Sequence, residues 1–143
     1  MKKVYVDMVG DLFHEGHIEL LKAARAFGDY LLVGVLSDQV VANYKRRPIM
    51  TMAERISVIQ ACRYVDEVIP DAPDVVTSEF LKTHGIVLVI HGSDISEEVI
   101  KVVYNDPFQE GKFKTVQRIG GISTTEIINR IRARYCLNEQ NSG

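Results

Sequence analysis

Two histidines near the start of the chain, in His14-Glu15-Gly16-His17, have the residue types and spacing for chemistry. Side chains three positions apart share one face of a helix, which suits either zinc or an anion. The sequence holds only two further histidines and no cysteine near either pair, so zinc is the weaker interpretation. At a helix N-terminus, imidazole and backbone N–H donors can face one phosphate, and Gly16 leaves it room. A plain helix start stays open as a third interpretation.

A second segment with similar potential is Gly120-Gly121-Ile122-Ser123-Thr124-Thr125-Glu126, in which a glycine pair precedes hydroxyl groups. The simplest interpretation is a capping box between Ser123 and Glu126 at the start of a helix. Arg118 stands just before the segment and adds a cation. The hydroxyls and helix N–H groups would then make a second phosphate site, facing the first.

Other charged residues are less specific. Lys45-Arg46-Arg47 could contact phosphate, although a short charge run is usually a solvated loop. Arg63 and Asp66 could form a structural ion pair or belong to an interface. Asp94, in the polar turn His91-Gly92-Ser93-Asp94, could form the turn or orient a ligand.

Between these motifs, short apolar runs alternate with stretches of helical periodicity. Gly28 is expected to end the first helix in a left-handed conformation, and Thr51 with Glu54 forms a capping box. The region from 95 to 111 is expected to be less regular. Strands are predicted at 4–6, 30–35, 67–69, 87–90 and 113–117, and helices at 16–27, from Ser37, at 51–62, 77–83 and 124–134.

This alternation predicts an α/β fold: a single Rossmann-like, doubly wound parallel sheet of about five strands, with helices on both faces. One domain is expected over residues 1–135, with a frayed tail at 136–143. Ligands of such sheets bind beyond the carboxyl ends of the strands. The polar segments that follow strands should therefore converge there: 7–17, 37–38, 91–94 and 118–124.

Bulk composition excludes several classes of protein. The net charge of −2 argues against a general nucleic-acid binder, so cations that meet an anionic ligand must be placed locally. Cys62 and Cys136 match no metal or redox spacing and are expected to be reduced thiols. No apolar run is long enough to span a membrane, and Met1-Lys2-Lys3 leads into a strand, so a soluble cytoplasmic protein is expected.

Taken together, these segments resemble the cytidylyltransferase family, within the nucleotidyltransferase superfamily marked by a His-x-Gly-His motif. The matching segments are His14-Glu15-Gly16-His17, Arg63-Tyr64-Val65-Asp66-Glu67-Val68 and Ile122-Ser123-Thr124-Thr125, in the expected order and spacing. The resemblance is greatest to the second of two similar domains in members that act on phosphoethanolamine. It is carried by Asp11-Leu12-Phe13-His14, Ala61-Cys62-Arg63-Tyr64-Val65 and Asp106-Pro107-Phe108-Gln109-Glu110, among others.

The resemblance implies roles for individual residues. His14, His17, Lys45 and Arg118 would contact the nucleotide phosphates and stabilise charge around the α-phosphorus. Asp11 and Asp94 would help to position substrate or a Mg²⁺ cofactor, and Arg63 would belong to the active-site framework and a dimer contact. The other implied nucleotide-binding residues are Met8, Val9, Gly10, Gly16, His91, Gly92, Ile122, Ser123 and Thr124. Met8-Val9-Gly10 replaces the Gly-x-Phe that is usual in the family, which leaves the second substrate open.

The implied reaction transfers CMP from CTP to a phosphorylated alcohol, phosphoethanolamine-like, and releases pyrophosphate. A phosphate monoester is already ionised near neutral pH, so positioning and charge neutralisation suffice and no strong general base is needed. The implied partners are CTP and a small phosphorylated acceptor in a homodimer, with no nucleic acid and no membrane insertion. Two alternatives stay open: an adenylyltransferase that uses ATP with a heptose phosphate or flavin mononucleotide, and a non-catalytic nucleotide-binding domain.

Overall fold

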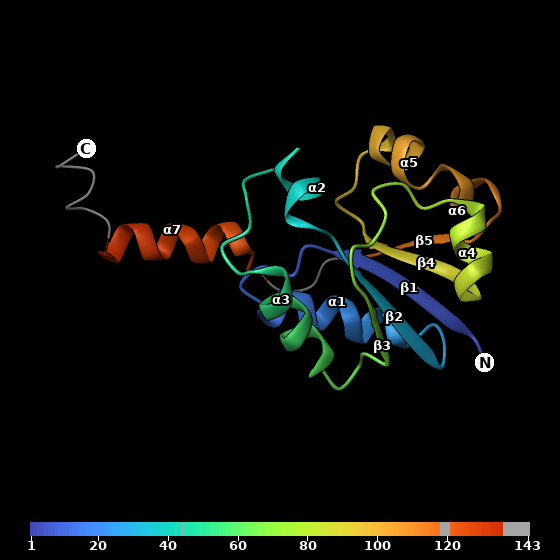
Figure 1. The fold of residues 1–143 in the computed structure, drawn as a ribbon, viewed down its shortest axis with the longest axis horizontal. Coiled ribbons are helices and arrows are strands. Elements are labelled where there is room, and N and C mark those ends of the chain that lie inside the picture. The colour runs from blue at the N-terminus through green and yellow to red at the C-terminus, as the bar shows by residue number, and fades with distance from the viewer. Residues whose placement is uncertain (44, 118–120, 136–143) are drawn as a thin grey trace.

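A five-stranded parallel sheet forms the centre of the protein (Figure 1). The computed structural model describes residues 1–43, 45–117 and 121–135. Its strands are β1 (Lys3–Met8), β2 (Tyr30–Val35), β3 (Glu67–Ile69), β4 (Ile86–Gly92) and β5 (Phe113–Val116). They lie in the order β3-β2-β1-β4-β5. Strands β2 and β3 are therefore added on one side of β1, and β4 and β5 on the other, so the switch point lies between β1 and β4. Ligands of doubly wound sheets bind at that switch point, beyond the carboxyl ends of the two strands.

Helices connect the strands, and polar side chains set where most of them begin. They are α1 (Glu15–Arg25), α2 (Asp38–Ala42), α3 (Met52–Gln60), α4 (Ser78–His84), α5 (Glu97–Val103), α6 (Asn105–Gln109) and α7 (Thr124–Tyr135). The predicted capping box of Thr51 and Glu54 begins α3, and Ser37 caps α2 through the N–H of Val40. The parallel α/β architecture predicted from the sequence is confirmed.

Each face of the sheet buries its own apolar cluster. On one face, β1 and β2 pack against Leu21 and Ala24 of α1 and Ile59 of α3. On the other face, Tyr5 and Leu32 pack with Leu81 of α4 and with Tyr104, at the junction of α5 and α6. Because every second strand residue points to the opposite face, both faces demand apolar side chains, which explains the continuous apolar runs.

Two local predictions are wrong. Gly28 does not have a left-handed conformation; the C-cap of α1 is Ala26, in a right-handed one. Gly28 is instead required by close packing, because a Cβ there would lie 2.5 Å from the carbonyl oxygen of Lys2. The region from 95 to 111 is also more regular than predicted, since it forms α5 and α6. The tail predicted to fray lies outside the described residues.

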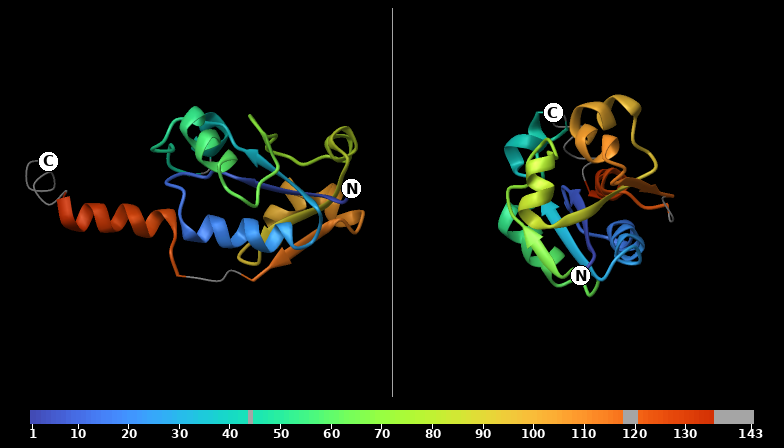
Figure 2. Two further views of the ribbon diagram at one scale, coloured as in Figure 1. Left: turned by 90° about the horizontal axis from the view of Figure 1, so that it is seen from below. Right: turned by 90° about the vertical axis from the view of Figure 1, so that its right-hand side faces the viewer.

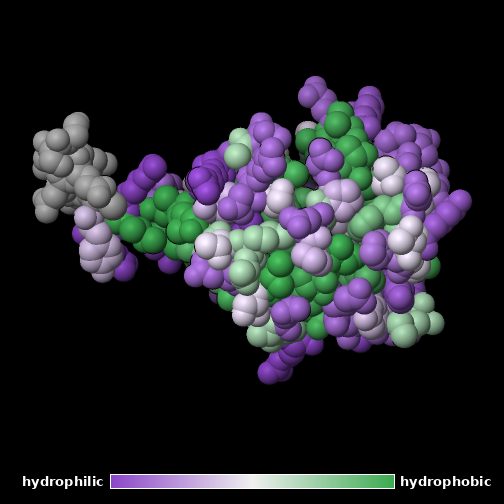
Figure 3. Space-filling view, in the orientation of Figure 1, coloured by the Kyte–Doolittle hydropathy of each residue, from purple (hydrophilic) through white to green (hydrophobic). Residues whose placement is uncertain are grey.

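Helix α7 extends away from the body of the domain (Figures 1 and 2). Its last turns carry exposed apolar side chains, including Ile131 and Tyr135, and Figure 3 shows hydrophobic surface along it. The helix begins at Thr124, beside the carboxyl ends of the strands, so its N-terminus belongs to the site described below. No helix within the described residues is long and apolar enough to cross a membrane.

Candidate functional site

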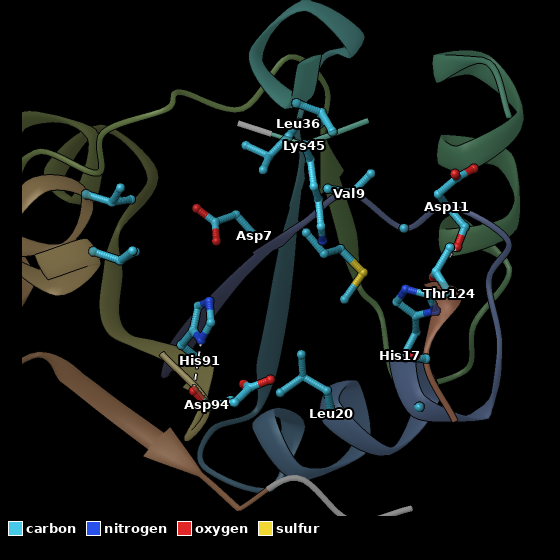
Figure 4. A pocket seen from close by; sticks show the side chains of 18 of the residues that line it. Asp7, Val9, Asp11, His17, Leu20, Leu36, Lys45, His91, Asp94 and Thr124 are labelled. Atoms are coloured by element: carbon cyan, nitrogen blue, oxygen red, sulfur yellow. Dashed lines mark hydrogen bonds between the residues drawn. The ribbon is translucent and has the colours of Figure 1, made fainter. Parts of the chain in front are cut away.

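A cavity of about 870 Å³ lies beyond the carboxyl ends of β1, β2 and β4 (Figure 4). It is where the topology places a ligand site, at the switch point between β1 and β4. Of the segments predicted to converge, 7–17, 91–94 and the described end of 118–124 meet here, whereas 37–38 does not line the cavity. Predicted site residues that line it are Met8, Val9, Gly10, Asp11, His14, Gly16, His17, Lys45, His91, Gly92, Asp94, Ser123 and Thr124.

The two histidines begin α1 with a capping box built from imidazoles. Nδ1 of His14 accepts a hydrogen bond from the N–H of Gly16 at 2.9 Å, and Nδ1 of His17 accepts from the N–H of His14 at 3.1 Å. Because each Nδ1 accepts, each neutral ring carries its proton on Nε2. The three-residue spacing therefore holds two Nε2–H donors in a fixed orientation at the cavity wall.

The start of α7 packs directly against the start of α1. The hydroxyl of Thr124 donates to the backbone oxygen of Asp11 at 2.9 Å and lies 3.3 Å from Nε2 of His14, which can donate to it. A Cβ on Gly16 would lie 2.8 Å from the backbone oxygen of Ile122, so only glycine permits this approach. Ile122 therefore contacts the site through its backbone. The two predicted phosphate segments meet as expected.

Basic side chains reach the cavity from the loop after α2. Lys45 projects from that loop toward the middle of the cavity (Figure 4). Nη1 of Arg46 lies 3.4 Å from the hydroxyl of Thr125, so it bridges the loop to α7. Ser123 caps α7 by accepting from the N–H of Glu126 at 3.1 Å, which is one half of the predicted capping box. Arg118 lies outside the described residues.

Asp7 lines the opposite part of the cavity; it belongs to the segment 7–17 that was predicted to converge here, but it was not among the predicted site residues. Its carboxylate accepts a hydrogen bond from the hydroxyl of Tyr104, and His91 lies nearby with Nδ1 2.9 Å from the carbonyl oxygen of Gly92 (Figure 4). Burial raises the pKa of the Asp7 carboxyl, and the Tyr104 hydrogen bond and the charge of His91 only partly offset this. One signal was available: Asp7 is the acidic residue that interrupts an apolar strand at its carboxyl end.

Further acidic side chains and several valines line the same cavity. Asp74, Asp94 and Glu98 line the cavity, as do the valines at 75, 99 and 102. These valines are 40%, 41% and 68% exposed, and hydrophobic surface is visible over α5 in Figure 3. In Figure 4, His17 and Thr124 lie on one side of the cavity, Asp7 lies on the other, and Lys45 projects between them.

Arg63 lies apart from the cavity, and Asp11 lines the cavity but uses its carboxylate for the backbone. Arg63 does not line the main cavity; it lies on a separate shallow groove with Phe13, Val58 and Tyr64. It forms no ion pair with Asp66 among the described residues, and Asp66 instead pairs with Arg25 at 3.1 Å. Residue Asp11 is only 4% exposed. Its two carboxylate oxygens accept hydrogen bonds from the backbone N–H groups of Ile49 and Met50, so both oxygens are already engaged.

Comparison with known proteins identifies the family. The family model described as cytidylyltransferase-like matches residues 10–130, and the chain belongs to this family. It is 40% identical over 145 residues to ethanolamine-phosphate cytidylyltransferase of Mus musculus, covering 98% of this chain and 36% of that protein. It is 43% identical over 137 residues to choline-phosphate cytidylyltransferase A of Rattus norvegicus, covering 93% of this chain and 37% of that protein. The chain thus spans about a third of the length of these relatives.

A solved structure supports the fold. The lipopolysaccharide core biosynthesis protein from Thermoplasma volcanium GSS1 superposes with a TM-score of 0.69 at 23% identity, covering 85% of this chain and 99% of that one. The predicted family and the predicted fold are therefore both confirmed.

Proposed function

We propose that this chain transfers CMP from CTP to a phosphorylated amino alcohol and releases pyrophosphate. The observation that carries the proposal is the two-ended cavity. Hydrogen-bond donors from His14 and His17 lie at one end, Lys45 projects toward the middle, and the Asp7 carboxylate lies at the other end. A nucleotide triphosphate fits the donor end, and a cationic headgroup fits the carboxylate end.

In this reaction a phosphate oxygen of the acceptor attacks the α-phosphorus of CTP. A new P–O bond forms as the bond between the α-phosphorus and its bridging oxygen to the β-phosphorus breaks, and pyrophosphate leaves. The nucleophile is already an anion, so the protein contributes orientation and charge stabilisation. The Nε2–H donors of His14 and His17 are held in place before substrate arrives, which avoids reorganisation during the reaction.

The carboxylate end favours phosphoethanolamine over phosphocholine as the acceptor. A primary ammonium group donates hydrogen bonds to carboxylates, whereas a quaternary ammonium group is usually bound by a cage of aromatic rings. Among the described residues that line the cavity, Tyr104 supplies the one phenol or phenyl ring, while Asp7, Asp74, Asp94 and Glu98 supply carboxylates. The curated relatives include both ethanolamine- and choline-phosphate enzymes, so this distinction depends on the cavity.

Magnesium is part of the proposal. No group of three or more His, Cys, Asp or Glu side chains within the described ranges could hold a metal ion. Mg²⁺ commonly binds through substrate phosphates with only one or two protein ligands, so Asp94 at the cavity wall is compatible with it. Bound there, the ion would neutralise phosphate charge. A homodimer and a cytoplasmic location are proposed from the family likeness.

The test is pyrophosphate release measured with CTP or ATP, each crossed with phosphoethanolamine, phosphocholine, glycerol 3-phosphate and a heptose phosphate. We expect release with CTP and phosphoethanolamine, and a smaller rate with phosphocholine. Release with ATP alone would contradict the assignment of the nucleotide. CTP binding without release for any acceptor would instead indicate a non-catalytic nucleotide-binding domain.

A further inference from the structure

Asp11 and Arg55 are the two buried charged residues within the described part of the chain, and both hold the backbone of Met50. The carboxylate of Asp11 accepts from the N–H groups of Ile49 and Met50, each at 2.9 Å. Nε of Arg55 donates to the carbonyl oxygen of the same Met50 at 3.3 Å. Both polar groups of one peptide position are thus fixed by buried side chains.

The remaining donors of Arg55 reach three other segments around the cavity. Nη1 donates to the carbonyl oxygens of Val9 and Leu36, each at 2.8 Å, just beyond the ends of β1 and β2. Nη2 forms an ion pair at 2.5 Å with Asp38, the first residue of α2. Arg55 is fully buried, and four of its five N–H donors are engaged.

These contacts hold both ends of the segment that carries Lys45, residues 38–50. Its beginning is held through Asp38, and the N–H of Lys45 bonds to the oxygen of Val41 at 2.8 Å. Its end is held at Met50. We propose that Asp11 and Arg55 are positioning residues that fix this segment, so that Lys45 and Arg46 meet the nucleotide phosphates. This inference deepens the proposed function and assigns Asp11 a backbone-holding role in place of a metal-binding one.

A lysine cannot replace Arg55 in this role. A guanidinium presents five donors in a rigid plane, whereas an ammonium presents three donors at one point and could not reach four separate segments. Arg55→Lys keeps the charge and most of the volume, but it releases part of the clamp. Asp38→Asn removes only the ion pair and serves as the milder variant if Arg55→Lys does not fold.

The first measurement follows backbone hydrogen exchange of residues 45–52 without any ligand. We expect faster exchange there in Arg55→Lys and Asp38→Asn, with exchange of β4 unchanged. The matched control is Arg25→Lys, which removes an arginine fork from Asp66 and the oxygen of Gly28, far from the cavity in the fold. Unchanged exchange at 45–52 in both clamp variants would overturn the proposal, whether or not CTP binds.

The second measurement is a double-mutant cycle on CTP affinity. We expect Arg55→Lys to weaken CTP binding by roughly tenfold to a hundredfold, because it misplaces contacting groups. If Arg55 acts through Lys45, the two substitutions should not add. The double variant should then bind CTP less than about threefold more weakly than the weaker-binding single variant. The proposal would be overturned if the loss of CTP affinity in the double variant equalled the product of the two single losses. In the control pair, the losses caused by Arg25→Lys and Lys45→Ala should multiply in this way. Failure of the unaltered chain to bind CTP would refute the proposed function and leave the exchange result to judge the clamp.

Discussion

Nε2 of His14 and the hydroxyl of Thr124 lie 3.3 Å apart although 110 residues separate them in the sequence. This contact joins the first residues of α1 and α7, and Thr124 also donates to the oxygen of Asp11. Because Nδ1 of His14 accepts from the N–H of Gly16, the proton of the neutral ring is on Nε2, which faces the hydroxyl of Thr124. A phosphate oxygen that binds here would replace the Thr124 hydroxyl as the acceptor of the His14 Nε2–H.

Substitution of His14 by asparagine should separate helix capping from phosphate contact. Asparagine is among the best N-cap residues, and its side-chain oxygen can accept from the N–H of Gly16 as Nδ1 does now. It lacks a donor at the position of Nε2. We expect the melting temperature to change little, while turnover falls on the order of 10²–10³, as for other preorganised donors. His14→Ala should lose turnover and about 1 kcal/mol of stability as well. Near-full turnover in His14→Asn would show that the imidazole acts only as a cap.

Gly16→Ala tests whether the contact between α1 and residue 122 builds the site. The added Cβ would lie 2.8 Å from both the Ile122 oxygen and Cε1 of His14, and the backbone oxygen cannot move without displacing the start of α7. We expect CTP affinity measured by calorimetry to fall at least about tenfold, because donors on α7 are displaced. Lys22→Ala, an exposed change on the same helix, is the control and should bind CTP normally. Equal affinities in the two variants would argue against the role of this contact.

Much of the fold and half of the site could be predicted because local rules decide them. The Thr51 and Glu54 capping box, the apolar runs and the order of polar segments are properties of short stretches of sequence. The donor-rich end of the cavity was predicted because its residues stand in recognisable motifs. The left-handed conformation predicted for Gly28 was wrong. Glycine is needed there because of close packing against Lys2, which no local pattern reveals.

Asp7 and Arg55 were missed for a related reason. Neither stands in a recognisable motif, and the hydrogen-bond partners of each come from distant segments. Arg63 stands in a recognisable family motif, and the fold places its side chain on a separate groove. Its predicted part in a dimer contact stays a prediction. Long-range hydrogen bonds set these positions, and only the tertiary structure specifies them.

Tyr5→Phe should stabilise the protein. The Tyr5 ring is fully buried, and its hydroxyl has no hydrogen-bond partner among the described residues. A buried unpaired hydroxyl costs roughly 1–3 kcal/mol, so its removal should raise the free energy of unfolding by about 1 kcal/mol. Gly34→Ala is the opposing variant: its Cβ would lie 2.1 Å from that hydroxyl and should destabilise the core. Urea unfolding of the two variants measures both effects. A loss of stability in Tyr5→Phe would mean that the hydroxyl is satisfied by a bound water.

Asp7→Asn should make the protein more stable at neutral pH and impair acceptor binding. Burial raises the pKa of Asp7, so the folded state binds this proton more tightly than the unfolded state. The folded protein therefore loses stability as the pH rises from the unfolded pKa, ordinarily 3.8, through the raised folded value. Asparagine escapes this cost. We expect the variant to melt higher than the parent at pH 7, with a difference that shrinks as the pH falls toward 3.8.

Glu110 provides a comparison of opposite sign. Hydrogen bonds from Ser78 and Lys112 lower its pKa, so its contribution to stability is present at neutral pH and is lost as the pH falls. Glu110→Gln should therefore melt lower than the parent at pH 7 and converge with it in acid.

For Asp7→Asn, the Michaelis constant for phosphoethanolamine should rise while CTP affinity stays within about twofold, because the ammonium contact is lost and the phosphate contacts remain. A variant that gains stability but binds phosphoethanolamine normally would show that Asp7 does not serve the acceptor.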